Sequence, residues 1–351
     1  MKDVVVSVRV DDKPKAMDGL EILVVSTEGE KDAKTYTELE EVGKEWGKES
    51  TVYGMVSAMF GQGGAVPQPP KLVRKVTVLG VGPVETPESL VRALKEYGSR
   101  NNDWYVFLTD RTEDEYILEL SEFAEESEPA EAELVSGTED HRKVYFAATR
   151  NKALSGAGAR SIIVYSENPG EHADAAYLGA VAPWYPKHVT WKFKMPEGIG
   201  VPSLTGTETD TLERNHINFV SDEYKNHYMK NGVCADGEWI DSLIGADWIA
   251  QDMRKELYVV FTQNEVVPYT DEGFTLVGMA LFRTLNKAVE HGIIASDGES
   301  GTGMYRVDIP ARASATEEQA RKREIPDIVW EAQLQGAAHG AVTRGVLKVN
   351  L

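Results

Sequence analysis

The longest regular pattern of apolar positions in the chain lies between residues 239 and 260. Apolar side chains recur there every three or four positions, a spacing that places them on one face of an α-helix. The members of this face are Trp239, Leu243, Ala246, Ala250, Met253, Leu257 and Val260. A stripe that continues over about six turns predicts a long helix with one buried face.

A second amphipathic helix is predicted directly after the first. Pro268 breaks the first pattern, and Thr270 is a suitable N-cap residue for a new helix. The apolar face of this helix comprises Phe274, Val277, Leu281, Leu285 and Ala288. Gly292 stands where a C-terminal glycine ends a helix. Two successive amphipathic helices need a common surface for burial, and the strand-like segments after residue 304 are the expected surface.

Strand and helix patterns alternate through roughly residues 21 to 200. The expected strands are residues 20–25, 73–79, 104–108, 144–148, 162–165 and 189–193, and the expected helices are residues 39–46, 52–60, 86–98, 112–123 and 173–180. Capping-box patterns at residues 37–40 and 112–115 support two of the helix starts, and the charged residues before 37 are expected to form a loop. This alternation predicts βαβ units with a largely parallel sheet.

Both ends of the chain alternate with the two-residue period of a β-strand. Apolar residues on one face of these predicted strands are Val4, Val6 and Val8 near the start, and Val342, Val346, Leu347 and Val349 near the end. A terminal strand without a local partner leaves its backbone donors and acceptors open. We therefore expect each end to join a sheet elsewhere, in its own chain or in another.

The charge and the apolar content of the chain exclude several classes of partner. The net charge of −20 disfavours phosphate neutralisation and contact with anionic membranes, so neither nucleic acid nor a membrane is an expected partner. The chain contains no apolar run of transmembrane length, and its first ten residues lack the apolar core of a signal peptide. The single cysteine, Cys234, excludes an internal disulfide. These features indicate production in the cytoplasm.

The βαβ pattern invites a search for nucleotide-binding loops. Gly43 and Gly47 begin a sequence that approaches a phosphate-binding loop, but they are one residue too close together and Gly43 lies within a predicted helix. Gly80 and Gly82 follow a predicted strand, yet the third glycine of a dinucleotide fingerprint is missing and Pro83 removes an amide donor. A chance resemblance and a tight turn are the favoured interpretations, and no cofactor is predicted.

The search for metal ligands and catalytic groups also ends without a matching set. Seven histidines are scattered without the spacing of a zinc motif, and the acidic loop at residues 297–303 lacks the spacing of a calcium loop. Cys234 is expected to be a small buried side chain. Asp241 and Asp247 are open to two interpretations, as paired catalytic acids or as residues that cap the long helix or fix its register. No catalytic and no metal-binding residues are assigned.

Several short segments of the C-terminal part resemble the core of contractile tail sheath proteins. They are residues 237–241 (GEWID), 245–248 (GADW), 268–273 (PYTDEG), 305–310 (YRVDIP) and 336–340 (GAAHG). Their order and spacing carry the resemblance over roughly the last 140 residues, and the earlier part is similar in layout. Sheath proteins of this family form the outer tube of myophage tails, R-type bacteriocins and related injection particles.

The resemblance implies an α/β fold in which a βαβ-type domain is inserted between terminal segments that together form a mixed α/β core. The implied segments are an N-terminal arm (1–20), an outward βαβ domain (21–200), the sheath core (201–340) and a C-terminal arm strand (341–351). The implied function is structural, not enzymatic: the subunit polymerises around an inner tube, and contraction drives the tube through a target cell envelope. The alternative is an enzyme or small-ligand-binding protein that uses the βαβ domain.

The resemblance also implies partners and contact residues. The partners are other copies of the chain, the inner tail tube protein, and baseplate and tail-terminator proteins, assembled into a virion tail or tail-like particle. The two terminal arms would pair with neighbouring subunits. A basic cluster near the C-terminus would touch the tube, and its members are Arg312, Arg321, Lys322 and Arg323. The same cations also fit an ordinary helix that is stabilised by pairs from Glu317 to Arg321 and from Glu318 to Lys322.

Overall fold

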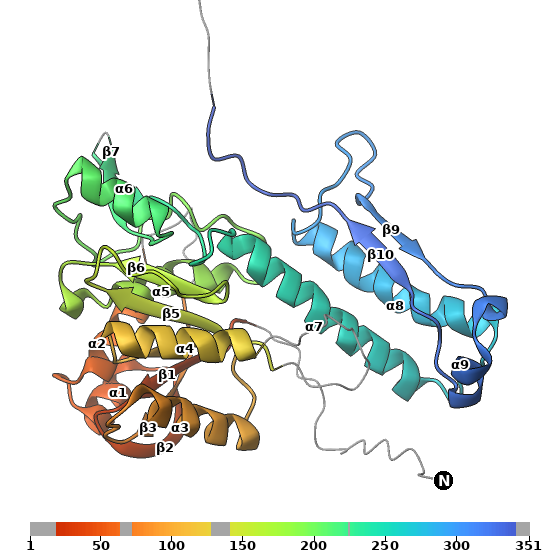
Figure 1. Ribbon diagram of the computed structural model, residues 1–351, viewed down its shortest axis with the longest axis horizontal. Coiled ribbons are helices and arrows are strands. Elements are labelled where there is room, and N and C mark those ends of the chain that lie inside the picture. Colours follow the sequence, from red (N-terminus) through yellow and green to blue (C-terminus); the bar gives the residue numbers. More distant parts are fainter. Residues whose placement is uncertain (1–18, 64–71, 128–140, 224, 342–351) are drawn as a thin grey trace, which may run out of the picture.

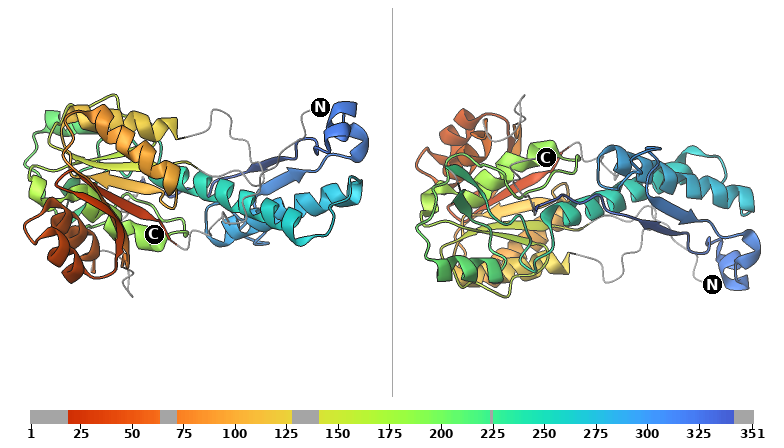
Figure 2. Two further views of the ribbon diagram at one scale, coloured as in Figure 1. Left: turned by 90° about the horizontal axis from the view of Figure 1, so that it is seen from below. Right: turned by 90° about the horizontal axis from the view of Figure 1, so that it is seen from above.

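The computed structural model describes residues 19–63, 72–127, 141–223 and 225–341. It contains a lobe built around a six-stranded sheet and an elongated part that extends away from this lobe (Figure 1). The two further views in Figure 2 show the same division from above and below. The predicted fold class is confirmed, because the molecule combines a βαβ sheet lobe with a helical part and a small antiparallel sheet.

The sheet of the lobe has the strand order β2-β3-β1-β4-β5-β6. Its strands are β1 (Ile22–Ser26), β2 (Glu30–Tyr36), β3 (Val76–Val81), β4 (Val106–Thr109), β5 (Val144–Thr149) and β6 (Ser161–Tyr165). The pairings among β3, β1, β4, β5 and β6 are parallel, and β2 runs antiparallel to β3 at one edge. The residues of β1, β4 and β6 are buried throughout, since helices cover both faces of the sheet.

Two groups of helices cover the two faces of the sheet. On one face, the first core is formed by the sheet with α1 (Leu39–Trp46), α2 (Thr51–Phe60) and α5 (Ala173–Val181). On the opposite face, the second core is formed with α3 (Pro87–Arg100) and α4 (Asp114–Glu126). A shorter helix, α6 (Gly206–Arg214), inserts Leu212 into the second core. The hairpin of β7 (Val220–Glu223) and β8 (Asn226–Met229) adds Val220 and Met229 to the first.

The elongated part is organised by the two predicted amphipathic helices, α7 (Ile240–Gln263) and α8 (Asp271–Glu290). The Oγ1 atom of Thr270 accepts a hydrogen bond from the amide of Gly273, which confirms the predicted cap, and Gly292 follows the helix with a φ of +76°. The antiparallel pair of β9 (Tyr305–Asp308) and β10 (Val329–Ala332) packs on α8 (Figure 1). The short helix α9 (Glu317–Lys322) lies between these two strands in sequence.

The predicted apolar face of the long helix is wrong in its first half. Trp239 is the half-buried N-cap residue, Leu243 is half-buried and Ala246 is exposed. The large apolar residues buried in this half are Ile240, Ile244, Trp248 and Ile249. Ile240 and Ile244 pack into the core of the lobe, whereas Trp248 and Ile249 pack into that of the elongated part. A helix held from two sides has no single apolar stripe, and only Met253, Leu257 and Val260 of the predicted face are buried.

Other predictions fail for local reasons. The segment expected to be a charged loop contains strand β2, whose side chains are mostly exposed because it is an edge strand. Residues 189–193 form no strand, since Phe193 adopts a left-handed φ of +64°. The capping boxes are absent from the starts of α1 and α4, where Glu38 and Glu113 are the N-cap residues and make no side-chain cap.

Candidate functional sites for assembly

A buried ion cluster joins α7 to the lobe. The carboxylate of Asp247, on the second turn of α7, accepts hydrogen bonds from the Tyr105 hydroxyl at 2.6 Å and from Arg142 Nη1 at 3.0 Å. It also accepts one from Arg160 Nη2, whose side chain is fully buried. Tyr105 and Arg160 directly precede β4 and β6, and Arg142 lies two residues before β5, so the three partners lie along the amino edge of the sheet. Burial also raises the pKa of Tyr105 well above its ordinary value, which keeps its hydroxyl a donor.

The charges of this cluster are costly to bury unless they are paired with good geometry. The Nε atom of Arg160 donates a further hydrogen bond of 2.7 Å to the carbonyl of Lys143, which fixes the plane of the guanidinium. Several directed contacts therefore determine how α7 leaves the lobe. Of the two interpretations of Asp247, this geometry favours a register role, because its side chain is only 8% exposed and is saturated by protein donors.

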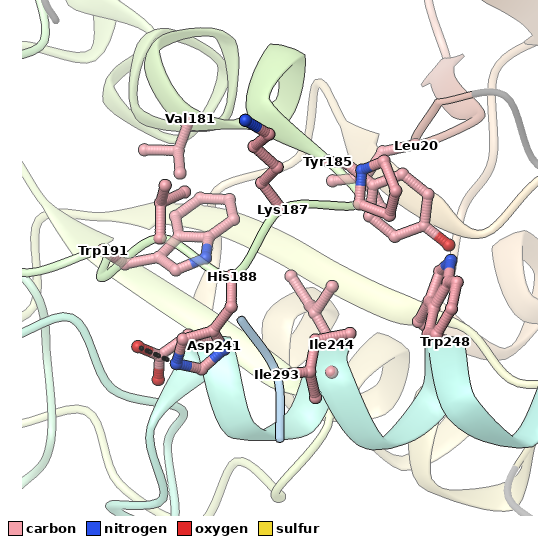
Figure 3. A pocket seen from close by; sticks show the side chains of 13 residues that line it. Leu20, Val181, Tyr185, Lys187, His188, Trp191, Asp241, Ile244, Trp248 and Ile293 are labelled. Atoms are coloured by element: carbon pink, nitrogen blue, oxygen red, sulfur yellow. Dashed lines mark ion pairs between the residues drawn. The ribbon is translucent and has the colours of Figure 1, made fainter. Parts of the chain in front are cut away.

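A small cavity lies beside this joint. Figure 3 shows its lining, in which Tyr185, His188 and Trp191 of the lobe face Ile244 and Trp248 of α7. Its volume is about 30 Å³. A pocket for a small organic ligand occupies roughly 300–1,000 Å³. The cavity thus has room for water and not for a substrate.

Asp241 faces His188 across this cavity. The Oδ2 atom of Asp241 is 3.5 Å from Nε2 of His188, and both side chains are buried (Figure 3). Burial raises the pKa of Asp241, and the neighbouring His188 and His339 oppose this rise. Asp241 and Asp247 therefore have different partners and do not form a pair of catalytic acids.

The C-terminal segment returns to the lobe through His339. Its Nε2 atom is 2.7 Å from the Oγ1 atom of Thr190, and its ring centroid lies 4.3 Å from that of Trp239 and 6.0 Å from that of Phe193. This contact joins the end of the described chain to the first residue before α7. The sequence indicated it only through the GAAHG segment, which contains His339.

The predicted basic cluster lies at the end of the elongated part that is remote from the sheet (Figure 1). Arg321 and Lys322 lie on the last turn of α9, and Arg323 follows it in the left-handed region. The guanidinium of Arg312 lies 4.6 Å from the ring centroid of Tyr269, whose hydroxyl donates a hydrogen bond of 2.8 Å to the carbonyl of Glu324.

Tyr269 therefore brings Arg312 next to the residues that follow α9. Sequence reasoning assigned no such role to Tyr269, although it belongs to the PYTDEG segment. Lys322 forms the expected pair with Glu318 at 3.0 Å. The Lys322–Glu318 pair is compatible with either interpretation of the basic cluster. The role of the cluster as a tube contact stays a prediction.

The predicted inter-subunit strand residues lie outside the described residues, namely Val4, Val6, Val8, Val342, Val346, Leu347 and Val349. Within the described residues, no cluster of three or more histidine, cysteine or acidic side chains is arranged to hold a metal ion. In the same part of the chain, no helix is long and apolar enough to cross a membrane. Cys234 is buried as predicted, and burial raises the pKa of its thiol.

The comparisons with known proteins agree with this architecture. Residues 240–308, from the start of α7 to the end of β9, match the model of the "E217 tail sheath protein gp31-like, C-terminal domain" family. A search of curated proteins gave no significant match. The helical sheath of the anti-feeding prophage in its contracted state has a TM-score of 0.67 at 12% identity, with 99% of this chain and 100% of that chain covered.

Two further solved structures share the fold. The contracted sheath complex of the extracellular contractile injection system PVC has a TM-score of 0.59 at 11% identity, covering 94% of this chain and 92% of that one. The sheath tail protein from Desulfitobacterium hafniense has a TM-score of 0.57 at 8% identity, covering 84% and 91% respectively. The chain thus has the fold of contractile sheath proteins. The resemblance inferred from the sequence is confirmed, and residues 240–308 are similar to a tail sheath C-terminal domain.

Proposed function

We propose that the protein is the subunit of a contractile sheath, which polymerises around an inner tube and contracts to drive that tube through a target cell envelope. The observation that carries this proposal is the family match over α7, α8 and β9 within a chain whose full length has the sheath fold. The saturation of Asp247 by protein donors also favours a structural role for this residue over catalysis.

The proposed organisation assigns a task to each segment. Residues 21–200 form the outward domain, residues 201–340 form the core near the tube, and residues 1–20 and 341–351 are arms that pair with strands of neighbouring subunits. Open strand edges satisfy their backbone groups by adding a strand from another chain. The two-stranded sheet of β9 and β10 has free edges within the described residues, and it is a suitable acceptor for such an arm.

The proposed tube contact is the basic cluster beside α9. The chain carries a net charge of −20, so a local group of cations selects an acidic partner surface and sets its register. Helix α9, which carries Arg321 and Lys322, lies at the end of the elongated part remote from the sheet lobe (Figure 1), and a tube contact at this end would leave the lobe pointing outward. Baseplate and tail-terminator proteins are further proposed partners at the two ends of the polymer.

Contraction, in this proposal, carries subunits outward from a metastable extended lattice to one of lower free energy, without a nucleotide. The cluster around Asp247 supports rigid-body movement of each subunit, because bending at this joint would expose or separate buried charges. The movement would then be taken up between subunits, through the arms. Synthesis in the bacterial cytoplasm precedes assembly into a virion tail or tail-like particle.

Electron microscopy of the purified full-length protein tests the proposal. Long hollow cylinders are the expected result, with wider cylinders in the contracted state. Discrete globular particles at all concentrations, together with bound nucleotide detected after denaturation, would favour the alternative of an enzyme or ligand-binding protein. Co-expression with the tube protein extends the test, since tube-filled extended sheaths are expected only for a sheath subunit.

A further inference from the structure

An exposed patch on the lobe combines apolar and basic side chains. Phe193 is 45% exposed and Met195 is 48% exposed, although large apolar side chains are usually buried. Lys192 and Lys194 alternate with them, and Lys230 of the neighbouring β8 end lies nearby in the fold. We call the surface formed by Lys192, Phe193, Lys194, Met195 and Tyr228 the 193 patch.

The backbone holds this patch in place. The amide of Phe193 donates to the carbonyl of Met229 at 3.0 Å, and the amide of Met229 donates to the carbonyl of Lys194 at 2.7 Å. Phe193 has a φ of +64°, a left-handed backbone conformation that is strained for a bulky side chain. Trp191, two positions earlier, is buried in the first core, so the left-handed turn directs the next aromatic ring outward instead.

The contacts that Phe193 makes within the subunit do not account for its strained backbone. The exposed ring makes a tilted contact with Tyr228 at a centroid distance of 5.4 Å and an edge contact with His339 at 6.0 Å. The ammonium group of Lys192 lies 5.3 Å from the same ring centroid and forms no ion pair among the described residues. A strained, solvent-facing aromatic ring beside an unpaired lysine is typical of a protein–protein contact with an acidic partner, whereas the nearby Lys230 already pairs with Glu223.

A surface with the complementary composition lies on α4 of the same chain. Glu115, Glu119 and Glu122 fall on one face of this helix, and Leu118 beside them is 36% exposed. None of these three carboxylates forms an ion pair with another residue in the described ranges. The 193 patch belongs to the side of the sheet covered by α5, and α4 covers the opposite side, so the two surfaces cannot meet within one subunit.

We propose that the 193 patch of one subunit binds the α4 face of a neighbouring copy, with Phe193 and Leu118 at the centre and the charges of Lys192 and Glu119 around them. Two different surfaces that bind head to tail form a heterologous contact, which generates rings or helical polymers rather than closed dimers. The inference rests on the proposed function, because it supplies a lobe-to-lobe contact for that polymer in addition to the arms.

A charge-swap experiment on the full chain tests this contact. Lys192→Glu and Glu119→Lys should each raise the protein concentration needed for cylinder formation by about tenfold, which is the effect of a 1.4 kcal/mol loss. The double variant Lys192→Glu/Glu119→Lys should restore assembly, since each reversed charge again meets its opposite on the next copy. Lys48→Glu and Glu85→Lys are matched controls at exposed positions of the same lobe and should assemble normally.

A second pair of variants separates assembly from folding. Phe193→Gly removes the ring and also relieves the left-handed strain, so the melting temperature should stay the same or rise while assembly weakens. Phe193→Ala removes the ring but keeps the strain, and it should weaken assembly to a similar degree. If the Phe193 ring only stabilises the fold, both variants would have a lower melting temperature, and the folded protein would assemble normally. That result would contradict the proposed contact.

The outcomes distinguish this inference from the proposed function. If the wild-type protein forms cylinders and both single charge reversals assemble like their controls, the 193 patch is not a subunit contact. If both reversals weaken assembly and the double variant fails to recover, α4 is not the partner surface. If the wild-type protein forms no cylinders under any condition, the proposed function itself fails, and sedimentation of the variants would reveal no concentration-dependent difference.

Discussion

The hydroxyl group of Tyr105 donates a 2.6 Å hydrogen bond to the carboxylate of Asp247, across 142 residues of sequence. The same carboxylate is shared by Arg142 and Arg160, which approach from the starts of two neighbouring strands. One acidic side chain on α7 thereby receives three donors from the amino edge of the sheet. This relationship fixes the long helix to the lobe, and it leads to the first prediction.

Asp247→Asn should destabilise the subunit by about 3–5 kcal/mol, because it leaves two buried guanidinium groups without their carboxylate. Thermal or denaturant unfolding of the isolated subunit measures this change. Asp308→Asn is the control, since Asp308 pairs with Arg306 at the surface and its loss should leave the melting temperature unchanged. Equal stability of the Asp247 variant and the wild type would mean that the cluster does not hold α7.

Leu257→Ala should cost about 2–5 kcal/mol through loss of packing between α7 and α8. Leu257 is 8% exposed and belongs to the core of the elongated part. Trp239→Ala should cost less, because Trp239 is only half-buried and precedes the first turn of α7. The comparison of the two unfolding free energies checks the position of the helix face, and a larger loss for Trp239 would contradict it.

The docking of His339 should weaken in acid. Burial, and then the charge of Lys192, lower the pKa of His339 below its ordinary value of 6.5. A lowered pKa means that the docked state favours the neutral ring, so docking is complete above pH 6.5 and is lost as the pH falls through the lowered value. Titration of the His339 ring protons by NMR should give a midpoint below 6.5.

Proteolysis near the C-terminus should accelerate over the same pH range. His339→Gln cannot titrate but can still hydrogen-bond to Thr190, so its cleavage rate should depend less on pH. His227→Gln is a control, because His227 is exposed on the β7–β8 hairpin and distant in sequence from the docking site. A midpoint at or above 6.5 would show that the docked ring accepts a proton without penalty.

Reversal of Arg321 and Arg323 together to Glu should leave a folded subunit that polymerises alone but fails to form extended sheaths on tubes. Both residues flank the end of α9, and neither is buried, so the fold should tolerate the change. Arg92→Glu together with Arg100→Glu, both exposed on α3 of the lobe, makes the same change in net charge and is the control. Normal tube-filled sheaths from the double variant would exclude the tube contact.

Deletion of residues 341–351 or of residues 1–10 should give a soluble, folded subunit that no longer forms cylinders. The reason is the loss of strand pairing between neighbouring subunits, while the described cores remain intact. Circular dichroism checks the fold, and electron microscopy checks assembly. Cylinders of normal length from either deletion would rule out a linking role for that arm.

The strands and helices that local sequence patterns define were predictable. The buried parallel strands appear as short apolar runs such as β1 and β6, and the start of α8 follows from the Thr270 cap. Strand β2 was not predictable by the same means, because its sequence EKDAKTY is that of an exposed edge strand and resembles a loop in composition. Phe193 escaped detection as well, since nothing in its neighbours indicates a left-handed backbone.

The candidate sites depended on contacts between distant residues. The sequence singled out Asp247 but offered no means of pairing it with Arg160, which is 87 positions away. The basic cluster was visible because three of its members are adjacent in the chain, whereas the organising role of Tyr269 required the fold. Residue types therefore suggested where to look, and long-range geometry decided what each group does.

Helix α7 also acts as a lever. Its 24 residues span about 36 Å at 1.5 Å per residue. Asp247 lies 16 residues, or about 24 Å, before the end of α7 at Gln263, so a rotation of about 10° at Asp247 would displace that end by about 4 Å, most of one helical turn of 5.4 Å. A variant with a slightly loosened joint would keep its melting temperature and its secondary structure, yet its distal end would be placed too inaccurately for the copies of the proposed polymer to share one lattice.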